Sequence, residues 1–311
     1  MKEIIITKEN QDQRLDKYLK RILSECSTSF IYKQLRKKNI VLNDKKATGS
    51  EKLLNGDSIK IYFSDESFEK LSGATKSDPY FSYLKGLDGK LEIIFEDENL
   101  IIINKPASIL TQKAKDTDVS INELALAYLI KKGELSEQAF KQFHPSVINR
   151  LDRNTSGIVL FAKTLYGSQV YSKMLKERDV KKIYRAIVVG KITDRQLIEG
   201  YLVKDENTNK VEIFNHPVDA AKPIKTEYWP IKALDNNLTL IEIHLITGRT
   251  HQIRAHLSSI NHPILGDNKY GNISINKKMN IHHQLLHAYS IEFSDSKKYI
   301  AKEPKEFNAY I

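Results

Sequence analysis

The sequence is poor in cysteine: Cys26 is the only one among 311 residues, which excludes an internal disulfide and a multi-cysteine zinc site. It also has no apolar run of 18 or more residues, so no membrane-spanning helix and no membrane partner are expected. The apolar stretch at residues 4–6 is too short for a signal peptide and predicts a short strand. We therefore expect a cytoplasmic protein, long enough to hold two domains.

Positive charge is in excess and is unevenly distributed along the chain. The formal net charge is +10, and residues 14–60 carry 12 Lys and Arg against 5 Asp and Glu, a net of +7. The rest of the chain carries 37 basic and 34 acidic residues, a net of only +3. A basic N-terminal module before a nearly neutral larger one indicates a polyanionic partner.

The N-terminal unit, residues 1–63, is predicted to combine two basic helices with a small sheet. Apolar residues recur at helical spacing in 13–23 and again in the segment that follows Ser27, a capping signal. A hairpin is expected around Asn43 and Asp44, and a strand at 58–63. Residues 64–90 have no clear periodicity and are predicted to be a linker, with one ordered piece near 80–84.

Residues 91–311 are predicted to form a second, strand-rich domain. Strands are expected at 91–97, 100–105, 158–162, 181–190, 226–231 and 238–245, with a β-arm over 203–226. Helices are expected at 120–132, 168–178 and after Gly248. The irregular succession of strands favours an α+β fold over a βαβ repeat.

The segment around Asp152 is the strongest candidate for chemistry. Asp152 lies between Arg150 and Arg153, in front of an Asn-Thr-Ser-Gly turn and a short apolar strand. Flanking cations favour an ionised carboxylate, which can act as a nucleophile, while arginines bind phosphates. The alternative is a surface Arg-Asp-Arg cluster that caps a turn.

A second polar segment, residues 245–257, places Arg249 where a strand meets a helix, and a helix N-terminus is a natural anion site. Arg254 is interpreted either as a phosphate ligand or as half of a structural salt bridge. Neutral, hydrogen-bonded histidines are the favoured interpretation of His244, His251 and His256, because no acidic ligand completes a metal site. No metal is expected.

The segment HPSVINRLDRNTSGIVLFAK, residues 144–163, resembles the catalytic motif of the RluA family of pseudouridine synthases. Further resemblances are the Asn-Lys-Pro at 104–106, the Lys-x-Tyr-x-Ala word at 182–186, TGRTHQIR at 247–254, PILGDNKYG at 263–271 and Leu-His-Ala at 286–288. The family's usual motif has His where Asn149 stands. The resemblance implies a large mixed, mostly antiparallel sheet flanked by helices.

The same resemblance implies the roles of three residues. Asp152 matches the catalytic aspartate, and Tyr184, which alone would be taken as ordinary strand packing, matches the tyrosine that stacks on the target uracil. Arg249 matches the arginine that pairs with the aspartate. The implied reaction isomerises uridine to pseudouridine in RNA with base flipping, without metal, redox step or cofactor. Arg150, Arg153 and Arg254 are then candidates for RNA phosphates.

The first 63 residues resemble the RNA-binding domain named after ribosomal protein S-four, in a form closest to the RluC branch of the family. This implies phosphate contacts from four cations that would otherwise be the solvated face of a helix: Lys33, Arg36, Lys37 and Lys38. Large-subunit ribosomal RNA is the expected substrate, and a monomer is expected. The alternatives are a transfer RNA synthase and a non-catalytic RNA-binding or ribosome-assembly factor. A glycoside hydrolase would need a second acid near Asp152, which no motif supplies.

Overall fold

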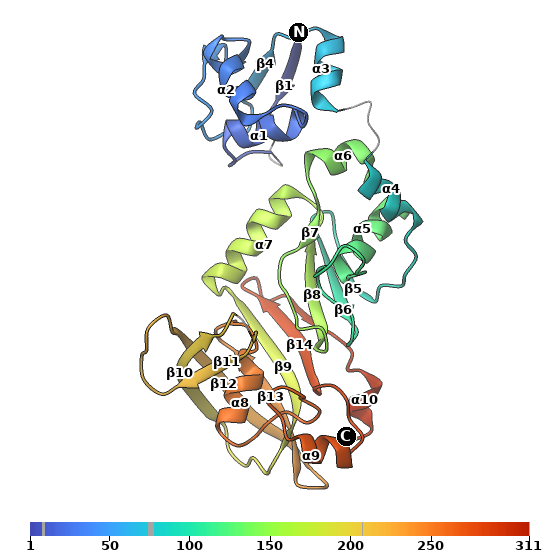
Figure 1. The fold of residues 1–311 in the computed structure, drawn as a ribbon, viewed down its shortest axis with the longest axis vertical. Coiled ribbons are helices and arrows are strands. Elements are labelled where there is room, and N and C mark those ends of the chain that lie inside the picture. Colours follow the sequence, from blue (N-terminus) through green and yellow to red (C-terminus); the bar gives the residue numbers. More distant parts are fainter. Residues whose placement is uncertain (8–9, 74–77, 207, 311) are drawn as a thin grey trace.

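The computed structural model describes residues 1–7, 10–73, 78–206 and 208–310. A small N-terminal unit lies at one end of the molecule, and a larger unit built on one sheet forms the rest (Figure 1). No described helix is both long enough and apolar enough to cross a membrane.

The N-terminal unit packs two helices against a four-stranded antiparallel sheet of order β1-β4-β2-β3. Its elements are β1 (Lys2–Ile5), α1 (Leu15–Ile22), α2 (Thr28–Arg36), β2 (Ile40–Leu42), β3 (Lys45–Lys46) and β4 (Ser58–Ile61). The Ser27 hydroxyl accepts the Phe30 N–H and caps α2, as predicted. Asn43 and Asp44 both adopt positive φ, 50° and 59°, so the predicted hairpin turn is confirmed.

The segment predicted as a linker, 64–90, contains two packed helices, and the second of them coincides with the ordered piece expected near 80–84. In α3 (Asp65–Ser72), Phe68 and Leu71 pack on the N-terminal core. In α4 (Pro79–Gly86), Phe81 and Leu84 are buried in the core of the larger unit. The first helix thus belongs to one unit and the second to the other. The segment lacks an obvious pattern because each helix is short and contributes only two such side chains.

The larger unit contains an 11-stranded sheet whose central path is β11-β10-β12-β13-β9-β14-β8-β6-β5, with β15 beside β14 and β7 beside β8. Its strands are β5 (Ile93–Glu96), β6 (Leu100–Lys105), β7 (Ser146–Val147), β8 (Ser156–Ala162), β9 (Val180–Val189), β10 (Gln196–Lys204), β11 (Val211–Phe214), β12 (Lys222–Leu234), β13 (Leu238–Leu245), β14 (Leu286–Phe293) and β15 (Lys298–Ile300). Of the described pairs only β8–β14 is parallel. The expected mixed, mostly antiparallel sheet is therefore confirmed, and β10–β11 is the expected arm.

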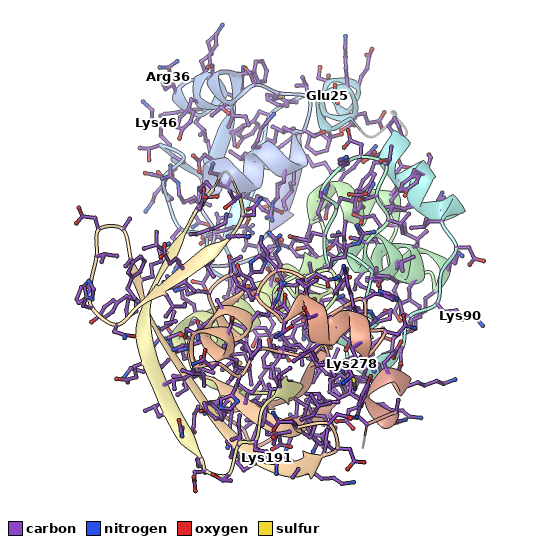
Figure 2. The ribbon with its side chains drawn as sticks, turned by 60° about the horizontal axis from the view of Figure 1, so that its bottom comes forward. Glu25, Arg36, Lys46, Lys90, Lys191 and Lys278 are labelled. Carbon is purple, nitrogen blue, oxygen red and sulfur yellow. The ribbon has the colours of Figure 1, made fainter. Side chains whose placement is uncertain are left out.

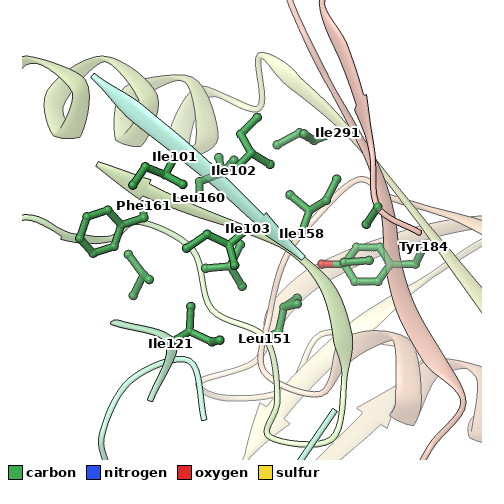
Figure 3. Close-up of a cluster of buried hydrophobic side chains, with 14 of the residues drawn as sticks. Ile101, Ile102, Ile103, Ile121, Leu151, Ile158, Leu160, Phe161, Tyr184 and Ile291 are labelled. Atoms are coloured by element: carbon green, nitrogen blue, oxygen red, sulfur yellow. The ribbon is translucent and has the colours of Figure 1, made fainter. Parts of the chain in front are cut away.

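Helices cover the sheet and close its ends. They are α5 (Ile121–Lys131), α6 (Glu137–Gln142), α7 (Leu165–Glu177), α8 (Gln252–Ser259), α9 (Ile273–Lys278) and α10 (Lys305–Asn308). Helix α7 packs along β8, whereas α8 lies against β11 and β12. The main core lies around β6 and β8, whose continuous apolar runs are buried on both faces. Figure 3 shows Leu151 and Tyr184 at one end of this core, so it extends to the neighbours of Asp152.

Gly157 is the second residue of strand β8, where that strand pairs with β14. Its φ is +107°, and a Cβ at this position would lie 2.3 Å from the Ala288 carbonyl oxygen and 2.6 Å from the Ala288 nitrogen. Because both neighbours are backbone atoms of a paired strand, neither moves without breaking the sheet next to the Asp152 turn. The turn therefore depends on glycine here.

We predict that Gly157→Ala lowers the free energy of unfolding by about 3 kcal/mol or more, through the clash and the strained φ together. Gly56→Ala is the matched control: its φ is +92°, but a Cβ there meets nothing within 4 Å. That control should cost only the backbone strain, about 1–2 kcal/mol. Urea denaturation of both variants measures the difference, and equal losses would show that the contact with Ala288 is unimportant.

Candidate active site

Asp152 lies in the turn between β7 and β8, at the entrance to the buried strand. The Thr155 N–H donates to the Asp152 carbonyl over 3.0 Å and closes the turn. The Thr111 hydroxyl accepts the Leu151 N–H and also bonds the Leu151 carbonyl, at 3.1 and 2.9 Å. Two segments far apart in sequence thus fix the backbone on which the carboxylate is carried.

Lys105 stabilises the Asp152 turn through hydrogen bonds, a role that the sequence analysis did not predict. Its side chain is fully buried at the end of β6, and Nζ donates to three carbonyls, those of Pro106, Ile109 and Arg153, at 2.8–2.9 Å. Burial lowers the pKa of Lys105 to about 8, while the charge of Asp152 acts in the opposite direction. The sequence feature that could have indicated this buried role is a lysine at the end of an apolar strand.

The ion pair with Asp152 is made by Arg254. Arg254 Nη1 donates to Asp152 Oδ2 over 2.7 Å. Arg249, for which this pairing was predicted, is exposed, and among the described contacts its side chain makes none with Asp152. The physical reason is where the helix begins: α8 starts at Gln252, so Arg254 lies on its first turn facing the cleft, whereas Arg249 precedes the helix.

Arg254 is itself held by a second carboxylate, Asp267. The guanidinium donates from Nε and Nη2 to both Asp267 oxygens at 2.7 and 2.9 Å, a bidentate pair. Side-chain exposure falls from 28% at Asp152 to 9% at Arg254 and 1% at Asp267, so the three charges run from the cleft into the interior. Arg254 is therefore fixed before any substrate binds.

Opposing effects set the charge states of Arg254 and Asp267. Burial opposes ionisation of Arg254, but the hydrogen bonds and charges of Asp267 and Asp152 outweigh it and raise the pKa of Arg254 above its ordinary value. For Asp267, burial alone would raise the pKa, but the bonds from Arg254 hold the pKa below its usual range. Both groups stay charged at neutral pH.

His251 approaches the other oxygen of Asp152. Its Nε2 lies 3.9 Å from Asp152 Oδ1, and its Nδ1 lies 2.9 Å from the Tyr270 hydroxyl. That hydroxyl also accepts the Val211 N–H, so its own proton is free to go to Nδ1, which favours the proton on Nε2, facing Asp152. The other two histidines have separate partners, since His244 lies 3.7 Å from Glu227 and His256 bonds the Thr226 hydroxyl.

Tyr184 projects from β9 toward the same cleft. Its ring is buried in the core, while the residue is also part of the lining next to Asp152. Burial, reinforced by the charge of Asp152, raises the pKa of Tyr184 well above its ordinary value, so the hydroxyl stays protonated. The arrangement offers a ring face for stacking and one O–H group beside the carboxylate.

The cleft around these residues has a volume of about 1050 Å³ and is strongly cationic. Eight Lys and Arg side chains line it, and Asp152 is the only Asp or Glu among the described lining residues. Arg150 and Arg153 are both in this lining and exposed, but Arg153 Nε bonds the Ser108 carbonyl and neither forms an ion pair with Asp152. A cleft of this charge suits a polyanion.

Asn149 has a structural role in place of the His of the family motif. Its Oδ1 accepts the Leu160 N–H over 2.7 Å, and its Nδ2 donates to the Ile158 carbonyl over 3.2 Å. The side chain thus mimics a strand backbone and attaches the Asp152 segment to β8.

The four predicted RNA-binding cations of the N-terminal unit lie on or just after α2. Lys33, Arg36, Lys37 and Lys38 are all exposed, and none forms an ion pair with another described residue. Figure 2 shows Arg36 on the outer edge of this unit with Lys46 near it. This face therefore presents unpaired charge to solvent.

Comparison with known proteins gives a consistent result. Residues 99–259 match the family model described as RNA pseudouridylate synthase. The chain is 36% identical over 295 residues to the ribosomal large subunit pseudouridine synthase C of Rickettsia bellii, covering 93% of this chain and 92% of that protein. It is 35% identical over 294 residues to a Mycoplasma genitalium protein named as an uncharacterized RNA pseudouridine synthase, covering 94% and 88%. The fold is similar to human RNA pseudouridylate synthase domain-containing protein 4, with a TM-score of 0.56 at 22% identity over 74% of this chain and 94% of that one.

Proposed function

This chain belongs to the RNA pseudouridylate synthase family, and from that premise we propose that it forms pseudouridine in large-subunit ribosomal RNA with Asp152 as the nucleophile. The observation that carries the proposal is the position of Asp152: it is the one carboxylate among the described residues that line a cationic cleft, fixed by Arg254 and next to Tyr184. Pseudouridine mapping with and without the gene tests it.

Asp152, Arg254 and Tyr184 have different roles in the proposed isomerisation. The bond from C1′ of the ribose to N1 of uracil breaks, the base rotates, a bond from C1′ to C5 forms, C5 loses its proton, and N1 gains a proton. Asp152 attacks either the anomeric carbon or the uracil ring, while Arg254 orients it. Tyr184 stacks on the base, which must leave its helix to reach the carboxylate. The atoms balance without a redox partner or a group donor, so no cofactor is proposed.

Large-subunit ribosomal RNA is favoured as the substrate by two observations. The similar protein of Rickettsia bellii is named for that RNA, and the match extends over the N-terminal unit as well as the catalytic one. Transfer RNA is the alternative substrate, and loss of pseudouridine in transfer RNA alone would establish it.

A factor that only binds RNA is disfavoured, because Arg254 forms ion pairs with both Asp152 and Asp267 and thereby holds the candidate nucleophile in place. We also propose that the protein acts in the cytoplasm as a monomer.

We predict that the N-terminal unit supplies much of the RNA affinity through its α2 charges. Replacing Lys33, Arg36, Lys37 and Lys38 together by Gln should weaken binding and lower the slope of log K against log salt by about 0.7–0.9 for each phosphate that is no longer neutralised. The fold should survive, because these side chains are exposed and unpaired. Filter binding of ribosomal RNA over a range of salt concentrations measures the slope.

The control removes the same number of charges from the larger unit. Lys277, Lys278, Lys298 and Lys305 are also exposed, and Figure 2 shows Lys278 on the larger unit, away from α2. Replacing these four by Gln should leave the slope near that of the wild type. Equal slopes for the two quadruple variants would show that the α2 charges of the N-terminal unit do not bind RNA phosphates.

A further inference from the structure

Strand β9 presents a second polar side chain to the cleft besides Tyr184. Lys182 precedes Tyr184 by two residues, and alternate side chains of a strand face the same side, roughly 7 Å apart. Both residues line the cleft that contains Asp152. The Lys182 ammonium also reaches Gly248 on the next wall, since a Cβ added there would lie 3.6 Å from Nζ. Lys182 therefore lies beside the site assigned to the target base.

The charge of Lys182 has no counter-ion in the described structure. Nζ makes no hydrogen bond and no ion pair with any described residue. Burial lowers the pKa of Lys182, and the positive charge of Arg178 lowers it further, with no carboxylate acting against them. A half-buried ammonium next to another cation is unfavourable unless an anion joins them.

Arg178 supplies a second positive charge in the cleft, close to Lys182. It ends helix α7 in the left-handed conformation, with φ of 64°, a position at which glycine is the usual residue. Its side chain is exposed and lines the cleft, and it too lacks an acidic partner among the described residues. The end of the helix dipole offsets part of this charge. Lys182, which lies on a strand, has no such compensation.

We propose that Lys182, together with Arg178, binds a phosphodiester group of the RNA immediately beside the nucleotide whose base stacks on Tyr184. The proposal rests on the proposed function, because it places the target base against Tyr184. One phosphodiester carries a single negative charge, which would supply the counter-ion that Lys182 lacks and would also attract Arg178. Lysine suits this contact because it acts as a point charge that accepts many phosphate orientations.

The test uses the full chain and compares neighbouring lysines. Lys182→Met removes the charge in the cleft, and Lys181→Met removes one from the adjacent residue, which is exposed and faces the opposite side of β9. Lys182→Arg restores the charge. The probe is a full-length, unmodified transcript of large-subunit ribosomal RNA, with kcat and KM measured at 0.1, 0.3 and 1 M potassium chloride.

The expected result is a change in KM that depends on salt. Removing one phosphate contact should raise KM about fivefold to eightfold at 0.1 M salt and leave no difference at 1 M, with kcat nearly unchanged. Lys182→Arg should recover most of the effect, and Lys181→Met should behave as wild type. Equal KM values for Lys182→Met and Lys181→Met, or a KM increase that is the same at every salt concentration, would overturn the proposal.

Binding measurements separate this proposal from the proposed function. In the Asp152→Asn background, filter binding compares the two lysine variants without turnover, on the ribosomal transcript and on a pool of transfer RNA transcripts. If wild type modifies only transfer RNA, the substrate assignment fails, yet a fivefold to eightfold weakening with Lys182→Met on that RNA still supports the phosphate contact. If Lys182→Met does not fold, Lys182→Gln replaces it in the same comparison.

Discussion

Replacing Asp152 by Asn is expected to abolish pseudouridine formation, with a loss in kcat of about 10⁴-fold or more, because an amide is not a nucleophile. The fold should be nearly unaffected: an Asn oxygen can still accept the hydrogen bond that Arg254 Nη1 now donates to Asp152 Oδ2. RNA affinity should stay close to wild type, since the cations of the cleft remain. Release of tritium from RNA labelled at C5 of uridine measures the turnover.

Asp116→Asn is the control for this variant. Asp116 is exposed and its carboxylate has no described partner, so the same chemical change there should leave kcat as in wild type. Turnover by purified Asp152→Asn above background would remove Asp152 from the role of nucleophile. Loss of RNA binding together with turnover would instead assign Asp152 to the structure of the cleft.

Replacing Arg254 by Gln is expected to damage both stability and catalysis. The change leaves Asp267 buried without its bidentate partner, and breaking such a pair costs about 3–5 kcal/mol in the free energy of unfolding. It also frees Asp152 to rotate, so kcat should fall by about 10²-fold or more. Urea denaturation and the tritium assay measure the two effects separately.

Arg249→Gln is the matched comparison, because Arg249 is the arginine that sequence reasoning paired with Asp152. Arg249 is exposed and forms no ion pair with Asp152 or Asp267. Its loss should therefore leave stability near wild type and reduce kcat less than the loss of Arg254 does. The reverse order, with Arg249→Gln inactive and Arg254→Gln active, would contradict the pairing of Arg254 with Asp152.

The stability loss in Arg254→Gln should also depend on pH. The folded-state pKa of Asp267 lies below its unfolded value, so its pairing stabilises the wild type above about pH 4 and that contribution is lost as pH falls through the lowered pKa. In the variant, protonation relieves the unpaired carboxylate. The difference in unfolding free energy between the two proteins should therefore shrink below about pH 4.

The sequence predicted what depends on local pattern. The β-branched and aromatic run after Asp152 indicated a buried strand, and β8 is that strand. Ser27 and Ser120 marked the starts of α2 and α5. The family motifs identified Asp152 and Tyr184, and the structure places both in one cleft.

What the sequence could not give depends on contacts between distant segments. Which arginine reaches Asp152 is decided by where α8 begins, and the motif does not show that start. Asp267 and Lys105 are buried charges whose partners Arg254 and Arg153 lie in other segments of the chain, so spacing along the sequence does not identify those partners. The helix at 65–72 in the predicted linker was not expected, because only its packing on the N-terminal core holds it.

The most direct test of Asp152-dependent pseudouridine formation is mapping of pseudouridine at single-base resolution. Total RNA would be compared from cells with the gene, without it, and complemented with either the wild-type or the Asp152→Asn gene. We predict that defined peaks in large-subunit ribosomal RNA vanish without the gene, return with the wild type, and stay absent with Asp152→Asn. Peaks that return with Asp152→Asn, or no change in any RNA on loss of the gene, would contradict it.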